Sequence, residues 1–334
     1  MSKHDLIWGD SVAVRQAFLE QTRGISIQFG LTELEAMDYT PFNGDAKLIE
    51  ETAKVILRHT GLKYDHIFLT NGATGACTIA LRAYARSGSY VAVITNPAPY
   101  FPLYPGMAHA AGLKHVTERE KMERAWKSVI LLDTPANPSG SIAEAPLWAS
   151  GCPVIWDAVY HNPAYCSILV PPPEHEVMVG SFSKLTGLNG LRLGWIATNH
   201  PFLAERIGKL IAPEYCGLSK PSKMILTTLL DQFNNDPDYF WGAFEQAARY
   251  KLDCNRTEWA KLEKYFNGYS VSPNGMFHYA YLDNAAKALL AEANVLYQAG
   301  SKCGTDDSFG RFNIGQDPKV ILSAVRAILK ADKI

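Results

Sequence analysis

The stretch VMVGSFSKLTGLNGLRLGW (177–195) decides the fold that we expect. It opens with an apolar run, VMVGSF (177–182), that is typical of a strand covered on both faces. Lys184 follows, so we expect it at the carboxyl end of a strand, the edge where open α/β sheets keep their chemistry. A lone lysine is more often a surface charge, and its interpretation therefore depends on its neighbours.

Composition indicates an ordinary soluble protein. The chain has 334 residues, 47% of them hydrophobic, and a formal net charge of −1. This length exceeds the usual ~100 to 200 residues per domain and favours two domains. The near-neutral charge gives no indication of a nucleic-acid or membrane partner. Neither a cleavable leader nor a membrane-spanning apolar run is apparent, so we expect a cytoplasmic protein with reduced cysteines. The cysteines lack the spacing of metal sites, so we expect no metal.

Apolar runs that alternate with helical patterns predict the fold class. The candidate strands are HIFLT (66–70), YVAVIT (90–95), SVILLD (128–133), PVIWD (153–157), VMVGSF (177–182) and GWIAT (194–198). Their near-continuous hydrophobicity predicts an α/β fold, with a mostly parallel central sheet and helices on both faces.

After residue 213 the pattern changes to that of a smaller α+β unit. The expected elements are helices near 221–234, 237–266, 284–292 and 317–331, and strands within 276–282, 295–300 and 310–315. We expect a large domain over 35–213, and a small domain built from 1–34 and 214–334 that includes an interdomain helix.

Two stretches indicate a phosphate site. TNGATGA (70–76) follows a predicted strand and precedes a helical pattern, so N–H groups at a helix N-terminus can face an anion. An ordinary tight turn is the alternative for this loop. Arg192 lies eight residues after Lys184, and its guanidinium suits a phosphate dianion, as does the Ser181 hydroxyl.

A lysine beside a phosphate site favours a carbonyl cofactor that carries a phosphate. Lysine forms a Schiff base with such a carbonyl when burial lowers the lysine pKa. Pyridoxal phosphate is a cofactor of this kind. It also needs a carboxylate opposite its ring nitrogen, donors for its ring hydroxyl and an aromatic ring over its face.

From about residue 39 to 315, the sequence resembles fold-type I pyridoxal-phosphate enzymes of the class I/II aminotransferase family. SFSK followed by GLRLGW is similar to the family's pattern of serine, lysine and arginine around the cofactor. The resemblance implies that Lys184 forms the Schiff base and that Ser181 and Arg192 bind the phosphate. It implies further phosphate contacts from Gly72, Ala73 and Thr74.

Two more motifs carry the resemblance to the ring-binding groups. DAVY (157–160) is similar to the family's D-x-x-Y, which implies that Asp157 faces the ring nitrogen and that Tyr160 bonds the ring hydroxyl. NPSG (137–140) is similar to N-P-x-G, which implies that Asn137 contacts the ring hydroxyl and lies beside the substrate. A helix N-cap and a simple turn are the alternatives for these two motifs.

An aromatic loop and an arginine strand complete the expected site. APYFPLYPG (98–106) resembles a family loop in which Phe101 would cover the ring, with Tyr100 as the alternative and as a substrate contact. FGRFNIG (309–315) resembles the strand whose arginine, here Arg311, would bind the substrate α-carboxylate.

The segment YTPFNGDAKLIEET (39–52) resembles a family motif whose tyrosine reaches the phosphate of a neighbouring subunit. Tyr39 therefore implies a homodimer with shared active sites. IWGD (7–10) is loosely similar to a glycine-bearing loop near the substrate.

The family resemblance implies transfer of an amino group between an amino acid and a keto acid. Lys184 would carry the proton, Asp157 would hold the ring nitrogen and Arg311 would orient the substrate. The same residues suit an α-decarboxylase or a β-eliminating lyase, since both reactions can use this framework. Two further hypotheses are a binding protein without turnover and an enzyme with an unusual biosynthetic acceptor.

Overall fold

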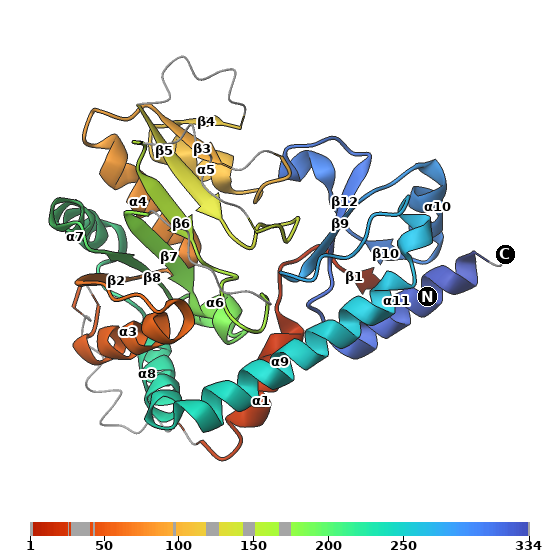
Figure 1. Cartoon of the computed structure of the whole chain (residues 1–334), viewed down its shortest axis with the longest axis horizontal. Helices are drawn as coiled ribbons and strands as arrows, with labels where there is room; N and C mark the ends of the chain where they lie inside the picture. The colour runs from red at the N-terminus through yellow and green to blue at the C-terminus, as the bar shows by residue number, and fades with distance from the viewer. Residues whose placement is uncertain are drawn as a thin grey trace.

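Two sheets of unequal size and a long helix organise the chain. The structure is a computed structural model and describes residues 3–25, 27, 41–42, 44–95, 98–117, 127–142, 151–166 and 175–332. Figure 1 shows α9 (Pro237–Ala260) running from α8 (Lys220–Asn235), below the larger sheet, toward the smaller one. Within the described residues, no helix is long and apolar enough to cross a membrane.

The larger sheet contains seven strands among the described residues. Their spatial order is β2 (His66–Thr70), β8 (Gly194–Thr198), β7 (Val177–Ser181), β6 (Val154–Asp157), β5 (Ser128–Asp133), β3 (Ala92–Thr95) and β4 (Lys114–Val116). Among the described strands of this sheet, β8 alone runs opposite to the other six, so the expected mostly parallel sheet is confirmed. β4 has no counterpart among the predicted strands, because its three residues include a single buried one.

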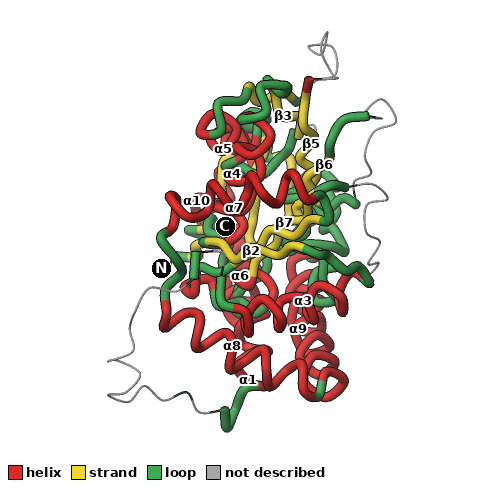
Figure 2. Tube along the Cα trace, turned by 90° about the vertical axis from the view of Figure 1, so that its left-hand side faces the viewer, coloured by secondary structure: helices red, strands yellow, loops and turns green. Residues whose placement is uncertain are grey.

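Helices cover both faces of this sheet. One face carries α4 (Gly72–Ala85), α5 (Tyr104–Ala110) and α7 (Pro201–Tyr215), and the other carries α3 (Ala46–Thr60) and α8. Figure 2 shows α4, α5 and α7 on one side of the central strands. Successive residues of β6 supply both cores, Ile155 packing with the first group and Trp156 with the second. This two-sided burial explains why the strands are apolar throughout.

Strand register brings three carboxyl ends to one edge of the larger sheet. Asp133 ends β5 and pairs with Asp157, which ends β6, while the neighbouring β7 ends at Ser181. The short helix α6 (Phe182–Leu185) starts there, and the Ser181 side chain caps it by accepting the N–H of Ser183. Lys184 is therefore held at the edge of the sheet, as its sequence position predicts.

The smaller sheet is antiparallel and lies in the last third of the chain. Its order is β11 (Gln298–Ala299), β12 (Phe309–Asn313) and β9 (Phe277–Tyr281), and α10 (Asn284–Glu292) and α11 (Pro318–Ala331) complete this region. β1 (His4–Asp5) pairs with β10 (Val295–Leu296), which joins the start of the chain to this region. Trp259, Phe266 and Phe312 belong to its core.

α9 ends earlier than the sequence pattern predicts. We expect a helix to residue 266, but the α-helix stops at Ala260 and the 3-10 turn η5 (Glu263–Tyr265) follows. Leu262 and Phe266 on either side of this turn are buried in the core of the smaller region. Near the other end of α9, α1 (Val12–Gln21) packs against it. The domain boundaries at 34/35 and 213/214 stay predictions.

Candidate active site

A cavity of about 810 Å³ opens at the edge where β5, β6 and β7 end. Residues from both sheets line it. The larger sheet and its loops contribute Ala73, Thr74, Phe101, Asp133, Asn137, Asp157, Tyr160, Ser181, Ser183, Lys184 and Arg192, and the smaller region contributes Phe277, Gln298, Lys302 and Arg311. Residues 8–10 contribute as well. Most of the residues that the sequence predicts for the site are thus brought together.

Lys184 is the amine of this cavity. Burial lowers the pKa of its amino group to about 8, Asp10 opposes this effect, and Arg311 and Arg192 add to it. The amino group donates a hydrogen bond to the carbonyl oxygen of Gly9. A pKa near 8 leaves a useful fraction of neutral amine at neutral pH, and the neutral amine is the form that attacks carbonyls or accepts protons.

The segment at residues 7–10 is held over the cavity by β12. Asn313 Nδ2 donates to the carbonyl oxygens of Trp8 and Asp10, the latter at 2.9 Å, and Arg311 donates to that of Ile7 at 3.1 Å. Sequence reasoning relates this segment only loosely to a substrate loop. Its position depends on hydrogen bonds to residues some 300 positions away, which local patterns do not report.

Arg192 and the start of α4 form an anion site. Gly72 has φ +72°, and a Cβ there would lie 2.9 Å from the Arg192 guanidinium, so the position requires glycine. The guanidinium donates to the Asn189 carbonyl at 3.1 Å, and no ion pair engages it among the residues that the structure describes. Ala73 and Thr74 line the cavity at the helix N-terminus, where N–H groups favour an anion. Together these groups fit a phosphate.

Asp157 is the buried carboxyl nearest the centre of the sheet edge. Its Oδ2 accepts the Tyr104 hydroxyl at 2.9 Å, and its Oδ1 accepts the N–H of Val159 at 3.1 Å. Burial raises the pKa of Asp157 to about 6, and the hydrogen bond from Tyr104 opposes this rise. A carboxylate in this position suits a protonated ring nitrogen. The Cys77 thiol, 3.8 Å from Oδ2, is a neighbour that sequence reasoning missed.

Arg311 is a buried cation whose hydrogen-bond acceptors in the described structure are neutral. It donates to Asn137 Oδ1 at 3.2 Å and to Gln298 Oε1 at 2.8 Å, besides the Ile7 carbonyl. Its guanidinium lies over the ring of Phe277, 4.4 Å from the centroid. Because a buried guanidinium gains most from an anionic partner, this arrangement suits a ligand carboxylate. Gln298 and Phe277 were not predicted, since each is unremarkable in the sequence.

Asn137 connects Arg311 to Tyr160. Its Nδ2 donates to the Tyr160 hydroxyl at 3.5 Å, and its Oδ1 accepts from Arg311. Burial raises the pKa of Tyr160 far above its ordinary value, so the hydroxyl stays protonated and can donate. Both side chains therefore present polar groups on the same wall of the cavity.

The two aromatic candidates have different surroundings. Phe101 lines the cavity, whereas Tyr100 is absent from the residues described as lining it. The Tyr100 N–H donates to the Cys303 carbonyl at 3.0 Å, and its ring packs against His115 with centroids 4.9 Å apart. Tyr100 thus joins the loop to η6 (Gly300–Cys303). Tyr39, the remaining candidate, lies outside the described residues.

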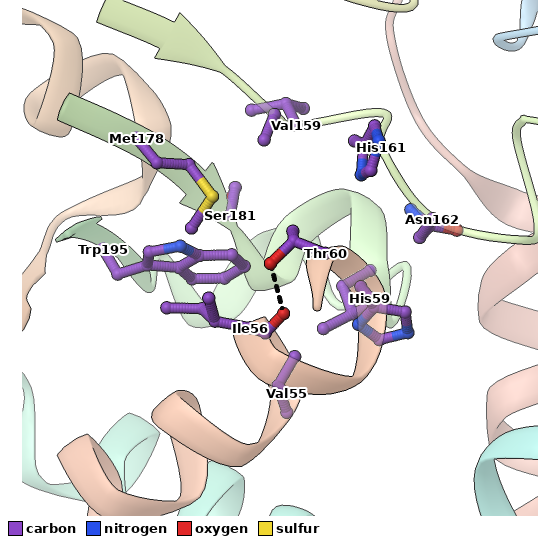
Figure 3. Close-up of a pocket in the computed structure, with 12 residues that line it drawn as sticks. Val55, Ile56, His59, Thr60, Val159, His161, Asn162, Met178, Ser181 and Trp195 are labelled. Atoms are coloured by element: carbon purple, nitrogen blue, oxygen red, sulfur yellow. Dashed lines mark hydrogen bonds between the residues drawn. The ribbon is translucent and has the colours of Figure 1, made fainter. Parts of the chain in front are cut away.

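A second, much smaller cavity lies behind Ser181. Figure 3 shows Ile56, Met178 and Trp195 around it, and its volume is about 20 Å³. Such a space holds at most about one water molecule. Among the described residues, no group of three or more His, Cys, Asp or Glu side chains is arranged to hold a metal ion.

Comparison with known proteins assigns the chain to a family. It matches the model for aminotransferase class I and II over residues 13–328, and therefore belongs to the class I and II aminotransferase family. Members of this family use pyridoxal 5′-phosphate, and they are transferases. The predicted family, fold class, transferase class and cofactor are confirmed.

Individual relatives agree with this assignment. The chain is 30% identical over 225 residues to "Tryptophan aminotransferase-related protein 1" of Oryza sativa subsp. japonica, covering 64% of this chain but only 49% of that protein. It is 25% identical over 340 residues to the bifunctional aspartate aminotransferase and glutamate/aspartate-prephenate aminotransferase of Petunia hybrida, covering 88% and 70%. A solved Thermus thermophilus aspartate aminotransferase shares the fold, with TM-score 0.79 and 16% identity over 98% of this chain and 91% of that one.

Proposed function

We propose that the protein is a pyridoxal-phosphate-dependent aminotransferase that moves an amino group between an amino acid and a keto acid. One observation carries the proposal. The amine of Lys184, with its lowered pKa, shares a cavity with a buried carboxyl and with a buried arginine whose described acceptors are neutral. The named relatives from Oryza sativa and Petunia hybrida are an aminotransferase-related protein and an aminotransferase, which favours transfer over decarboxylation or elimination.

The cavity offers a group for each part of the cofactor. We assign the phosphate to Arg192, Ser181 and the N–H groups at Gly72, Ala73 and Thr74. The ring nitrogen would face Asp157, the ring hydroxyl would meet Asn137 and Tyr160, and Phe101 rather than Tyr100 would cover the ring. When bound, the cofactor withdraws electrons from the substrate α-carbon, which makes the α-proton acidic.

Lys184 is the proposed covalent attachment point and proton carrier. As a neutral amine it would accept the α-proton of the substrate and carry that proton within the cavity. Arg311 would bind the α-carboxylate with two hydrogen bonds and so orient the α-carbon of the substrate for proton removal. Asp157 keeps a negative charge beside the ring nitrogen and so holds a proton there. Asn137, which bonds Arg311, would also contact the substrate.

Covalent labelling tests the assignment of Lys184. Reduction of the cofactor-loaded protein with borohydride, followed by peptide mapping, should place the pyridoxyl group on Lys184. Lys184→Arg keeps a positive charge in the cavity and should lose the label while retaining its thermal unfolding temperature within a few degrees. A label on another lysine, or none in a protein that binds the cofactor, would contradict the assignment.

We also propose a cytoplasmic homodimer with shared active sites, in which Tyr39 reaches the phosphate of the neighbouring subunit. The proposal rests on the family motif at residues 39–52. Mixed dimers of Lys184→Ala and Tyr39→Phe chains should recover part of the activity that each variant lacks alone, because one of the two sites would be intact. If subunit exchange is demonstrated and activity still does not recover, the proposal of shared active sites is contradicted. The division into domains 35–213 and 1–34 plus 214–334 belongs to the same proposal.

A further inference from the structure

Asp133 is a buried carboxyl to which the proposed function gives no role. It ends β5 and pairs in register with Asp157, which ends β6. Both residues line the cavity, and only 3% and 8% of their surfaces are exposed. Paired residues on neighbouring parallel strands project their side chains to the same face of the sheet. The two carboxyls therefore lie side by side at the edge of the cavity.

The surroundings of Asp157 favour a negative charge on that member of the pair. It accepts hydrogen bonds from the Tyr104 hydroxyl and the Val159 N–H, and the Cys77 thiol approaches it. Burial raises the pKa of both Tyr104 and Cys77 well above their ordinary values, so each remains a neutral donor. Hydrogen bonds donated to a carboxylate stabilise its ionised form.

Asp133 is placed where a second charge is unfavourable. Burial raises the pKa of its carboxyl to about 7, the Asn137 N–H at 2.8 Å lowers it, and the Asp157 carboxylate raises it again. Two adjacent buried carboxylates repel each other, so the pair loses its protons in two separated steps.

The groups around the pair come from several elements. Cys77 of α4 and Tyr104 of α5 interact electrostatically with both carboxyls, and so does Tyr160 after β6. On the side of the smaller sheet, Arg311 of β12 bonds Asn137, the residue whose N–H Asp133 accepts. Cys77, Tyr104 and Tyr160 are neutral, whereas the cationic side chains of Lys184, Arg192 and Arg311 line the same cavity.

We propose that Asp133 and Asp157 share one proton, which Asp133 holds while Asp157 carries the single negative charge. This inference rests on the proposed function, in which that charge faces the cofactor's ring nitrogen. Asp133 acts through Asp157 and is a positioning residue. Loss of its proton at higher pH places a second negative charge beside the first.

Carboxyl titration of the full-length protein tests the pair directly. Aspartate labelled with ¹³C at Cγ is incorporated, and the spectrum is followed from pH 4 to pH 9 with and without cofactor. The Asp133 and Asp157 signals are assigned by their loss in Asp133→Asn and Asp157→Asn. We expect the Asp133 signal to titrate near neutral pH in the cofactor-free protein and the Asp157 signal to titrate at lower pH. Both signals titrating below pH 5 would overturn the proposal, and this result needs no variant activity.

Asp133→Asn provides the second readout. The asparagine oxygen still accepts the Asn137 N–H, so the turn is kept while the proton-binding group is removed. Asp133 is neutral when Asp157 titrates, so we expect Asp133→Asn to change the Asp157 midpoint little and to abolish the near-neutral step in the pH profile of kcat. Asp157→Asn removes the neighbouring charge, so there we expect the Asp133 midpoint to fall by about one pH unit or more. Asp133→Ala, which also loses the acceptor, controls for stability. An Asp133 midpoint unchanged in Asp157→Asn would overturn the proposal.

Failure of the pair and failure of the proposed function give different results. The cofactor-free titration reports on the two carboxyls whether or not the protein is an aminotransferase. Borohydride labelling of Lys184 reports on cofactor attachment whether or not Asp133 holds a proton. If Lys184 is labelled and both Asp133 and Asp157 titrate at acidic pH, only the shared proton is rejected. If Asp133 titrates near neutral pH and Lys184 is not labelled, only the proposed function is rejected.

Discussion

Replacing Arg311 with lysine keeps a positive charge in the cavity but removes the planar fork that can hold a carboxylate with two hydrogen bonds. In the structure this guanidinium already bonds Asn137, Gln298 and the Ile7 carbonyl, and it stacks on Phe277. Its orientation is thus fixed before substrate arrives. A lysine ammonium has too few donors to bond these three acceptors and also bind a carboxylate.

The expected loss follows from one charge-assisted hydrogen bond. Such a bond contributes about 1.5 to 3 kcal/mol, so Arg311→Lys should lower kcat/KM for the best amino donor by about 10- to 150-fold. The loss should be smaller than about threefold for the corresponding amine without a carboxylate, because that substrate makes no contact with the fork. Steady-state kinetics with the two donors measure both numbers.

A matched control separates the carboxylate contact from general damage. Arg206 also lies over an aromatic ring, with its guanidinium 4.2 Å from the Phe202 centroid, but it is not among the residues that line the cavity. Arg206→Lys should leave both kcat/KM values unchanged. If Arg311→Lys slowed the amino acid and the amine equally, the assignment of Arg311 as carboxylate anchor would be refuted.

Three further predictions concern the cofactor. Because burial lowers the pKa of Lys184 to about 8, the rate of cofactor attachment should rise with pH and level off above pH 8. Stopped-flow absorbance measures this rate, and a rise that continues to pH 10 would contradict the prediction. Tyr104→Phe removes the hydroxyl that bonds Asp157, and should weaken cofactor affinity about 10- to 150-fold by equilibrium dialysis, with unchanged affinity as the contrary result. Gly72→Ala would place a Cβ 2.9 Å from a nitrogen of the Arg192 guanidinium and should weaken cofactor affinity by about tenfold or more. Gly88 has a similar φ of +70° but open space around it, so Gly88→Ala should leave cofactor affinity unchanged. Equal effects of the two variants would exclude the clash as the cause.

Sequence patterns predicted the parts of the fold that depend on local chemistry. The strands of the larger sheet follow from apolar runs, and five of the six predicted strands of that sheet begin within one residue of their observed positions. The family motifs found Lys184, Asp157 and Arg311, because each is set in a recognisable local context. They also found Arg192.

The rest of the site depends on tertiary register. Asp133 resembles any aspartate at a strand end until the pairing of β5 with β6 places it beside Asp157. Gln298 becomes a site residue only because β11 pairs with β12, opposite Arg311. The carbonyl of Gly9 reaches Lys184 through hydrogen bonds to β12 that no local pattern predicts. The Tyr100 N–H likewise bonds the Cys303 carbonyl of η6, a contact that the aromatic motif does not predict.

The most direct test of the central claim is a single half-reaction. The cofactor-loaded protein is mixed with an excess of amino donor in the absence of keto acid, and the released cofactor and products are measured by mass spectrometry. Aminotransfer predicts one equivalent of pyridoxamine 5′-phosphate and one of keto acid per active site, because the amino group has no other acceptor. Continued release of carbon dioxide or of an eliminated fragment, with the cofactor recovered as pyridoxal 5′-phosphate, would contradict aminotransfer.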